Sequence, residues 1–563
     1  MNIRHVILIL LLALTGGSRG EALDFRQFGQ LAIQDAGRRK PVDTFARETL
    51  LRISGAATYT GTDGTVWSAP DFVLSVLFAT HNWKTEPLIL IPYHPLAQML
   101  GLDAQRKRFS LDELAGAATL PALIQQGQEL SRQEKEVPRE LKEAESLAMR
   151  MEALGHLMDN SAFAIVPPAP GAKSDRWSVP TPDDQAYDQA AYKVAMDELS
   201  QMVQTYTGGN GFDFSVHAAR LRKSLRDLNP SVYPTDSMLQ LEYTYNHLRA
   251  FTWAVAIYSL AFVLLLIANA SKGPAKLLTI SGLVLALGGV LMHGAGIALR
   301  CIIAGRPPVT NMFESVVWVS FGIMIFALIF LMRYRALTYL LAALPVSLTC
   351  LLLVQQLPVA MPESIDPLVP VLRSNTWLTI HVLTITLSYA AFALAMGFGH
   401  IVLFRFIRDP HNAAEDATLH FWLYRILQLG VLLLAAGTIL GGVWANYSWG
   451  RFCGWDPKET WALIALLCYI FVLHGRIVGW WDQFGLALAS VVCFCAVMMT
   501  WYGVNFILGK GLHSYGFGIG GEKYVAAFVC ADLTYVAFAA LRYRKAALHL
   551  TGTPVEETSM SDI

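Results

Sequence analysis

The chain has 563 residues, of which 54% are hydrophobic and 15% charged, and its formal net charge is zero. Together with a mean hydropathy of +0.41, this composition indicates a polytopic membrane protein with a soluble part. The balanced charge gives no case for nucleic-acid binding. All seven cysteines lie at or after Cys301, so the soluble part carries no disulfide framework. No CxxCH sequence is present, which argues against covalent attachment of a c-type haem to this chain itself.

The first 22 residues have the features of a secretory signal. Arg4 precedes a short apolar core at residues 6–14, and small residues follow up to Ala22. The core is too short to span a membrane comfortably, although an uncleaved N-terminal anchor is the alternative. We therefore expect the residues that follow to lie outside the cytoplasm.

Residues 23–245 are expected to form a soluble, largely helical domain. Helix-forming residues dominate three stretches, and residues 167–182 are a Pro-rich connector. The expected helices lie at residues 111–157, 189–205 and 214–228. No paired-carboxylate, triad or phosphate-loop pattern rises above chance here, so we expect a structural or partner-docking domain.

Residues 250–545 have the pattern of a membrane domain, and residues 546–563 form a tail. Each expected span is close to the roughly 20 apolar residues that cross a hydrocarbon core. The nine spans are 250–269, 276–299, 313–332, 336–355, 377–404, 425–445, 461–480, 484–506 and 522–541. Basic residues between spans, such as Arg333, Arg405 and Arg542, fall on one side, which the positive-inside rule assigns to the cytoplasm. The soluble domain then lies outside and the tail inside.

An aromatic-rich loop is expected from residue 444 to residue 461, between the sixth and seventh spans. Its four tryptophans are Trp444, Trp449, Trp455 and Trp461. Asp456 is a good helix N-cap, Pro457 suits the first helical position, and Glu459 stands three residues after the cap. Aromatic belts at membrane interfaces are the ordinary explanation for such residues. The alternation with glycines and the capped turn favour instead a flat apolar platform for a large planar ligand.

Three separated motifs resemble the CcsA (ResC) branch of the haem-handling proteins of cytochrome c maturation. The aromatic stretch resembles their tryptophan-rich WWD signature. Residues 503–505 (GVN) and 511–516 (GLHSYG) resemble the sequence that follows the signature, and residues 307–315 (PPVTNMFES) resemble the sequence before it. The resemblance covers residues 280–541 and has one departure, because Cys453 stands where the family usually has an aromatic, most often Trp. Either a smaller side chain is tolerated at this position of the aromatic platform, or the Cys453 thiol has a role of its own.

The resemblance implies a polytopic α-helical subunit of a cytochrome c synthase in the bacterial plasma membrane. Such a protein would bind haem b, present it at the outer face and support its thioether attachment to the CxxCH sequence of apocytochrome c. The expected partners are a CcsB/ResB-like subunit, apocytochrome c, a thiol-reducing protein and membrane lipid. Residues 37–47 also resemble a segment of extended CcsA-type proteins, but no chemistry is assigned to them. No catalytic acid or base is assigned.

Three alternatives to this function stay open. A haem transporter or chaperone without ligase activity, as in the CcmC-like branch, would be shorter and lack the GLHSYG run. A member of the CcmF-like branch would be longer and have more spans. A secondary transporter of a small solute often contains internal repeats, and none is evident in this sequence.

Two histidines are expected at the outer surface beside the aromatic stretch. His381 opens the fifth expected span, and His513 follows the eighth. Two neutral imidazoles facing each other across the platform can supply both axial ligands of a haem iron. The alternative for either histidine taken alone is an ordinary polar residue at a membrane interface.

Two further histidines, His474 and His293, lie within expected spans, where ionisable residues are costly and a functional role is the default expectation. The resemblance implies that His474 contributes to an inner haem site whose other ligand comes from a CcsB-like subunit. His293 is a candidate ligand within the chain, or it forms hydrogen bonds near the outer site. Haem propionates require cationic or amide donors. The candidates on the outer side are Arg306, Arg451 and Asn311.

Overall fold

The computed structural model describes residues 23–133, 135–271, 273, 275–368, 374–409, 417–508 and 520–551. The chain divides into two compact units, unit 1 at residues 1–247 and unit 2 at residues 248–563. The predicted signal at residues 1–22 lies outside the described residues. Helices dominate both units, as the composition and the patterning predict.

Unit 1 combines helices with three two-stranded antiparallel sheets among its described residues. The strands are β1 (Ala32–Asp35), β2 (Arg38–Pro41), β3 (Thr58–Thr60), β4 (Val66–Ser68), β5 (Ile89–Leu90) and β6 (Arg108–Phe109). The helices are α2 (Arg26–Gly29), α3 (Val42–Ser54), α4 (Ala69–Leu77), α5 (His94–Met99), α6 (Leu111–Ala115), α7 (Leu120–Arg132), α8 (Arg139–Met158), α9 (Gln189–Thr207), α10 (Gly211–Leu228) and α11 (Asp236–Leu248). Helices α6 to α10 confirm the three helical stretches predicted from the sequence.

Residues 37–47, to which the sequence analysis assigned no chemistry, form part of the first hairpin and the start of α3. Ala36 and Gly37 form its two-residue turn, and both have positive φ, 49° and 79°, as a type I′ turn requires. Arg38 then donates to both carboxylate oxygens of Glu242 at 3.0 and 2.5 Å. Thr44 donates to the same carboxylate at 2.8 Å. These contacts attach α11 to β2 and α3, so the segment serves the packing of unit 1.

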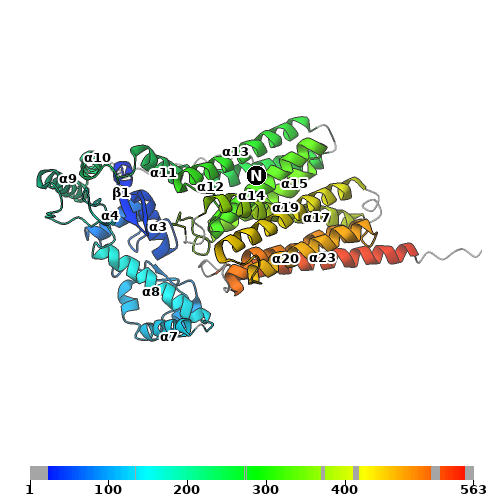
Figure 1. The fold of residues 1–563 in the computed structure, drawn as a ribbon, viewed down its shortest axis with the longest axis horizontal. Helices are drawn as coiled ribbons and strands as arrows, with labels where there is room; N and C mark the ends of the chain where they lie inside the picture. The colour runs from blue at the N-terminus through cyan, green and yellow to red at the C-terminus, as the bar shows by residue number, and fades with distance from the viewer. Residues whose placement is uncertain are drawn as a thin grey trace, which may run out of the picture. The chain divides into compact units, whose positions relative to one another are not determined.

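Unit 2 is a bundle in which long helices run alongside one another (Figure 1). Its helices are α12 (Ala250–Ala270), α13 (Lys276–Ala304), α14 (Met312–Tyr334), α15 (Thr338–Gln356), α16 (Asn375–Trp377), α17 (Leu383–Arg408), α19 (Ala417–Trp449), α20 (Pro457–Ile477), α21 (Gln483–Val492), α22 (Phe494–Met498) and α23 (Glu522–Thr551). Two π-helices, η2 (Leu378–Val382) and η3 (Met499–Leu508), continue into or out of these helices.

Nine helices in the described part of the chain are long and apolar enough to cross a membrane. They coincide with the nine predicted spans, so the chain is a multi-pass α-helical membrane protein. Two spans differ from the expectation in their internal form. The fifth begins with η2, and the eighth is divided into α21, α22 and η3. These breaks occur where hydropathy continues unchanged, so the hydrophobic pattern could not reveal them.

The centre of unit 2 is α17, the most buried of the candidate spans in the described residues. It packs against α14, α15, α19 and α21. Small residues permit this close packing, as in other membrane bundles. A Cβ atom at Gly397 would lie 2.8 Å from the carbonyl oxygen of Ala342, and one at Gly437 would lie 2.8 Å from Cβ of Ile385. This packed centre positions η2, which leads directly into α17 and contains His381.

Candidate functional site

The aromatic stretch is mostly helical, which corrects the expectation of a loop from residue 444 to residue 461. Helix α19 continues through Trp449, and α20 begins at Pro457. Trp444 and Trp449 therefore belong to the last turns of one helix, and Trp461 belongs to the first turns of the next. Trp, Tyr and Asn are compatible with a helix once it is packed, so propensity alone could not set this boundary.

The short connection between these helices ends in a capping box, as predicted. The Asp456 side chain accepts from the backbone N–H of Lys458 at 2.9 Å. The Glu459 carboxylate accepts from the backbone N–H groups of Asp456 at 3.2 Å and Gly454 at 2.7 Å. Cys453 Sγ donates to the same carboxylate at 3.4 Å. These bonds satisfy exposed N–H groups at the start of α20 and fix the course of the connection.

A cavity of about 320 Å³ lies beside this connection, within the size range of ordinary ligand pockets. Its lining comes from the starts of α14 and α20, from η2, α17, α19 and η3, and from the connection itself. Of the residues that the sequence analysis named, the structure brings His381, Asn311, Trp444, Cys453, Trp455 and Asn505 together here. We call this cavity the aromatic pocket.

His381 is oriented in the aromatic pocket by a backbone carbonyl. Its Nδ1 lies 2.8 Å from the carbonyl oxygen of Gly437, and because a carbonyl only accepts, Nδ1 carries the proton. In the neutral ring the lone pair is then on Nε2, the arrangement typical of metal-ligating histidines. A Cβ atom at Gly441 would lie 2.6 Å from Cε1 of His381. Any side chain at residue 441 would therefore collide with the imidazole ring.

Indole rings form the apolar walls beside His381. Trp444 meets the imidazole edge-on, with ring centroids 5.7 Å apart. Trp377 stacks on Trp444 at 6.4 Å with an interplanar angle of 7°. Trp455 also lines the pocket, is 69% exposed, and has a φ of 55°. A left-handed conformation costs a non-glycine residue about 1–2 kcal/mol, so the capped connection holds this indole in a strained position at the pocket.

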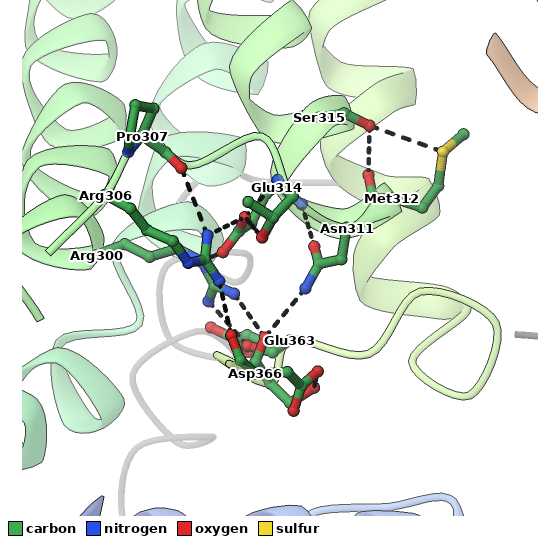
Figure 2. A network of polar contacts seen from close by, with 11 residues as sticks. Arg300, Arg306, Pro307, Asn311, Met312, Glu314, Ser315, Glu363 and Asp366 are labelled. Carbon is green, nitrogen blue, oxygen red and sulfur yellow. Dashed lines mark hydrogen bonds and ion pairs between the residues drawn. The ribbon is translucent and has the colours of Figure 1, made fainter. Parts of the chain in front are cut away.

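A buried polar network lies at the start of α14, whose first residues also line the pocket (Figure 2). Arg300 donates to one Glu314 oxygen at 2.9 Å and Arg306 donates to the other at 3.0 Å. The two guanidinium groups also donate to the backbone carbonyls of Glu363 at 2.8 Å and Asp366 at 3.1 Å. Two cations thus share one carboxylate and hold the segment that follows α15 against the start of α14.

The network is continuous with the aromatic pocket through three lining residues. Thr310 donates to Glu314 through its backbone N–H at 2.8 Å and its hydroxyl at 2.7 Å. Asn311 is the N-cap of α14, accepting from the Glu314 N–H at 2.8 Å. Ser315 accepts from the Trp501 indole N–H at 3.1 Å. The propionate contacts predicted for Arg306 and Asn311 stay predictions, and the geometry favours a structural role for Arg306.

His293 lies in a packed aromatic environment and not among the residues that line the aromatic pocket. It is fully buried, and its Nε2 lies 3.1 Å from the carbonyl oxygen of Val317. Its Nδ1 lies 3.4 Å from the hydroxyl of Tyr258. Phe251 and Phe321 meet the ring edge-on. Both ring nitrogens have partners within the fold, which favours the hydrogen-bonding alternative over a ligand role.

The remaining predicted site residues lie elsewhere or outside the described part of the chain. His474 follows the lining residue Leu463 by 11 residues in α20, about 16 Å along the axis, and it is not among the described lining residues of the pocket. Its Nδ1 lies 2.9 Å from the carbonyl oxygen of Ile470. Arg451 is exposed beside Gly454. His513 lies outside the described residues. Trp449 and Trp461 are half-buried in their helices, and neither is among the described lining residues.

Sequence reasoning assigned no role to Lys458, Trp501 or Tyr389, which also line the aromatic pocket. Trp501 and Tyr389 lie inside apolar spans, where an aromatic residue is ordinarily a packing residue. Lys458 follows the cap of α20, and a lysine near the end of a span is ordinarily an interfacial residue. Lys458 lies two residues after Asp456, at the end of the connection between α19 and α20. That position is the only sequence signal that could have marked it as a pocket residue.

Comparison with known proteins agrees with this geometry. A family model described as cytochrome C assembly protein matches residues 302–513. The chain is 32% identical to protein NrfI of Wolinella succinogenes over 521 residues, covering 87% of this chain and 54% of NrfI. It therefore spans about half the length of that relative. It is 35% identical to the cytochrome c biogenesis protein CcsA of Guillardia theta over 243 residues, covering 38% of this chain and 79% of that protein.

A second CcsA protein, from Prochlorococcus marinus strain MIT 9301, is 35% identical over 253 residues, covering 39% of this chain and 80% of that protein. The family-model match includes the aromatic stretch and the start of α14, which meet at the pocket. The family acts in cytochrome c assembly, a process that involves haem. The chain belongs to the CcsA family of cytochrome c biogenesis proteins.

Proposed function

We propose that the chain is the haem-binding subunit of a cytochrome c synthase and that the aromatic pocket is its outer haem site. The observation that carries the proposal is His381, whose Nδ1–H is held by the Gly437 carbonyl at 2.8 Å while the ring lines the pocket. A neutral imidazole in this tautomer is suited to ligate iron through Nε2. His513 is proposed as the second axial ligand.

The other pocket residues suit a planar, largely apolar substrate such as haem b. Trp444 and Trp455 offer indole surface, and Gly441 and Gly442 leave room where side chains would intrude. The residues therefore bind and orient haem and exclude water from its ring, which are contributions of positioning more than of acid–base chemistry.

The reaction that this positioning would serve is thioether formation. Each thiol of the CxxCH sequence in apocytochrome c adds across one haem vinyl group. A carbon–sulfur bond forms, the S–H bond breaks, and the hydrogen ends on the other vinyl carbon. The histidine of the apocytochrome then replaces one axial histidine and releases the product. A haem transporter or chaperone without this ligase step is the alternative.

We further propose that haem reaches the pocket from an inner site at His474, with the second inner ligand supplied by a CcsB-like subunit. His474 lies about 16 Å along α20 beyond Leu463, the last lining residue of that helix, which fits a second site closer to the other membrane face. The pocket and unit 1 would then face the outside of a bacterial plasma membrane, and the C-terminal tail would face the cytoplasm. A thiol-reducing protein would keep the apocytochrome cysteines reduced.

Replacement of the outer ligand tests the proposal. His381→Gly should reduce holocytochrome c to background in cells that co-express a reporter apocytochrome, because the iron loses one axial ligand. Added imidazole should restore part of the yield by filling the empty coordination position. Haem-stained gels measure the yield, and the visible spectrum of the purified protein reports the ligation.

His156→Gly is the matched control, because His156 is an exposed histidine of unit 1, with 51% of its side-chain surface accessible. Wild-type yield from the His381 variant without imidazole would refute the site.

A further inference from the structure

Lys458, which has no carboxylate partner among the described residues, lines the aromatic pocket. Lys458 lies in the first turn of α20, and its Nζ is 3.4 Å from Oδ1 of Asn505. In the described part of the chain it forms no ion pair, and its nearest polar partner there is the Asn505 amide. Its two acidic neighbours in sequence are both engaged with backbone N–H groups of the capping box.

The surroundings of Lys458 make this arrangement costly unless a ligand compensates it. Most of the lining is apolar, including Trp455, Leu463 and Trp501. An ammonium group removed from water is unfavourable unless an opposite charge or hydrogen bonds replace its hydration. The amide of Asn505 supplies one acceptor, and its own Nδ2 donates to the Trp501 carbonyl at 2.8 Å. That bond fixes the amide so that Oδ1 faces the lysine.

We infer that Lys458, held by Asn505, anchors a carboxylate of the molecule that occupies the aromatic pocket. The inference rests on the proposed haem-binding function, and the carboxylate is then a haem propionate. The two arginines that the sequence analysis named as propionate partners are less suited to this role. Arg306 is committed to Glu314 and to the Asp366 carbonyl, and Arg451 is absent from the described lining.

An anchor at α20 would also set the orientation of haem. His381 fixes the iron at the centre of the ring, and Lys458 fixes one edge. The vinyl groups of haem b are on the pyrroles that do not bear propionates. A propionate at Lys458 would therefore turn the vinyl-bearing edge away from the start of α20.

Esterified haem tests the inference directly. Haem and its dimethyl ester differ only at the propionates, which are charged carboxylates in haem and neutral methyl esters in the other ligand. The change in their relative affinity between the wild-type protein and a Lys458 variant therefore reports the carboxylate contact. Purified full-length protein stripped of haem should bind haem on the order of tenfold to a hundredfold more tightly than the ester, as expected for a charge-assisted contact in an apolar site. Lys458→Gln should abolish most of this preference, and Lys458→Arg should retain it.

Comparison of the two ligands on each variant forms a double-mutant cycle, so differences in ester solubility cancel. Lys523→Gln is the matched control, because Lys523 is an exposed lysine at the start of α23, and it should keep the full preference. The wild-type measurement requires no variant, so a folding defect in Lys458→Gln does not remove the test.

The possible failures are distinguishable. Equal affinity of the wild-type protein for haem and its ester, or an undiminished preference in Lys458→Gln, would overturn the inference while leaving the haem site in place. Binding of neither ligand at the pocket, judged by an absorption spectrum that does not change with His381→Gly, would overturn the proposed function and the inference with it.

Discussion

Glu314 is a single carboxylate on which two guanidinium groups converge in the interior of unit 2. It is 1% exposed, Arg300 is 1% exposed, and each has direct protein partners. Buried charges of this kind are stable only as a complete set, since the removal of one member leaves the others desolvated. The network therefore holds the Thr310–Asn311 wall of the aromatic pocket only while Glu314 is charged.

Glu314→Gln should destabilise unit 2 by about 3–5 kcal/mol, the usual cost of breaking a buried ion pair from one side. The apparent melting temperature of the detergent-solubilised protein, followed by circular dichroism, checks this. Asp366→Asn is the matched control, because it removes an exposed carboxylate and keeps the backbone carbonyl that accepts from Arg306. Equal melting of the two variants would contradict the assignment of Glu314 as the centre of the network.

Single residues were predictable where their chemistry is local. The cap at Asp456 and Glu459 follows from neighbours three residues apart, and the structure confirms it. His381 and Trp444 were selected by type and by resemblance, and they do meet in one pocket. The partners of Arg306 could not be predicted, because the Asp366 carbonyl is 60 residues away and backbone carbonyls carry no sequence signal.

Among the elements, α23 depends most on a polar contact. It is the least buried of the candidate spans in the described residues. His400 in α17 lies 3.2 Å from Asp532 in α23, and the Tyr535 hydroxyl donates to the His400 carbonyl at 3.0 Å. Nδ1 of His400 lies 2.8 Å from the Met396 carbonyl and must donate to it, so the contact at Nε2 requires a second proton shared with Asp532.

Asp532→Ala should loosen α23 from the bundle, at a cost of about 1.5–3 kcal/mol for a hydrogen bond that involves a charged group. Faster hydrogen–deuterium exchange across residues 522–545, measured by mass spectrometry, is the expected result. Thr534→Ala serves as the control, because Thr534 is exposed and bonds only to the Cys530 carbonyl in its own helix. The same exchange rate in both variants would show that the pair does not hold α23.

Element positions followed from hydropathy, whereas element ends did not. Nine apolar stretches predicted nine spans because crossing a membrane requires both length and apolar character. The end of α19 was placed too early, since Trp449 and its neighbours are polar or aromatic and still helical. The interruption of the eighth span arises from packing around α20 and α17, which the one-dimensional pattern does not contain.

At the scale of the whole molecule, the division at residue 247 separates unit 1 from the membrane bundle of unit 2. Unit 1 has a core of its own around Trp83, which is 1% exposed and donates to Ser75 at 2.8 Å. The class of each unit was predictable from composition, since one part lacks long apolar runs and the other consists of them. The internal sheets of unit 1 were not, because two- to four-residue strands are too short to leave a pattern.

Residues 23–247 expressed alone should fold, because a unit with its own core needs no other part of the chain for stability. Cooperative thermal unfolding by circular dichroism is the measurement. A shorter piece, residues 23–228, should melt at a lower temperature, since it lacks α11 and leaves Arg38 without Glu242. Failure of residues 23–247 to unfold cooperatively would argue that unit 1 depends on the membrane domain.

The π-helix η2 has a consequence for how this protein aligns with its relatives. A π-helical turn holds one residue more than an α-helical turn, and each residue of an α-helix rotates its successor by about 100°. The extra residue within Leu378–Val382 therefore decides which side of the span His381 occupies. A relative without that residue would keep an unbroken span and a histidine at the same hydropathic depth, yet the position of its imidazole around the helix axis would differ by about 100°. Alignments of this segment are therefore informative only when a one-residue gap is placed inside the turn.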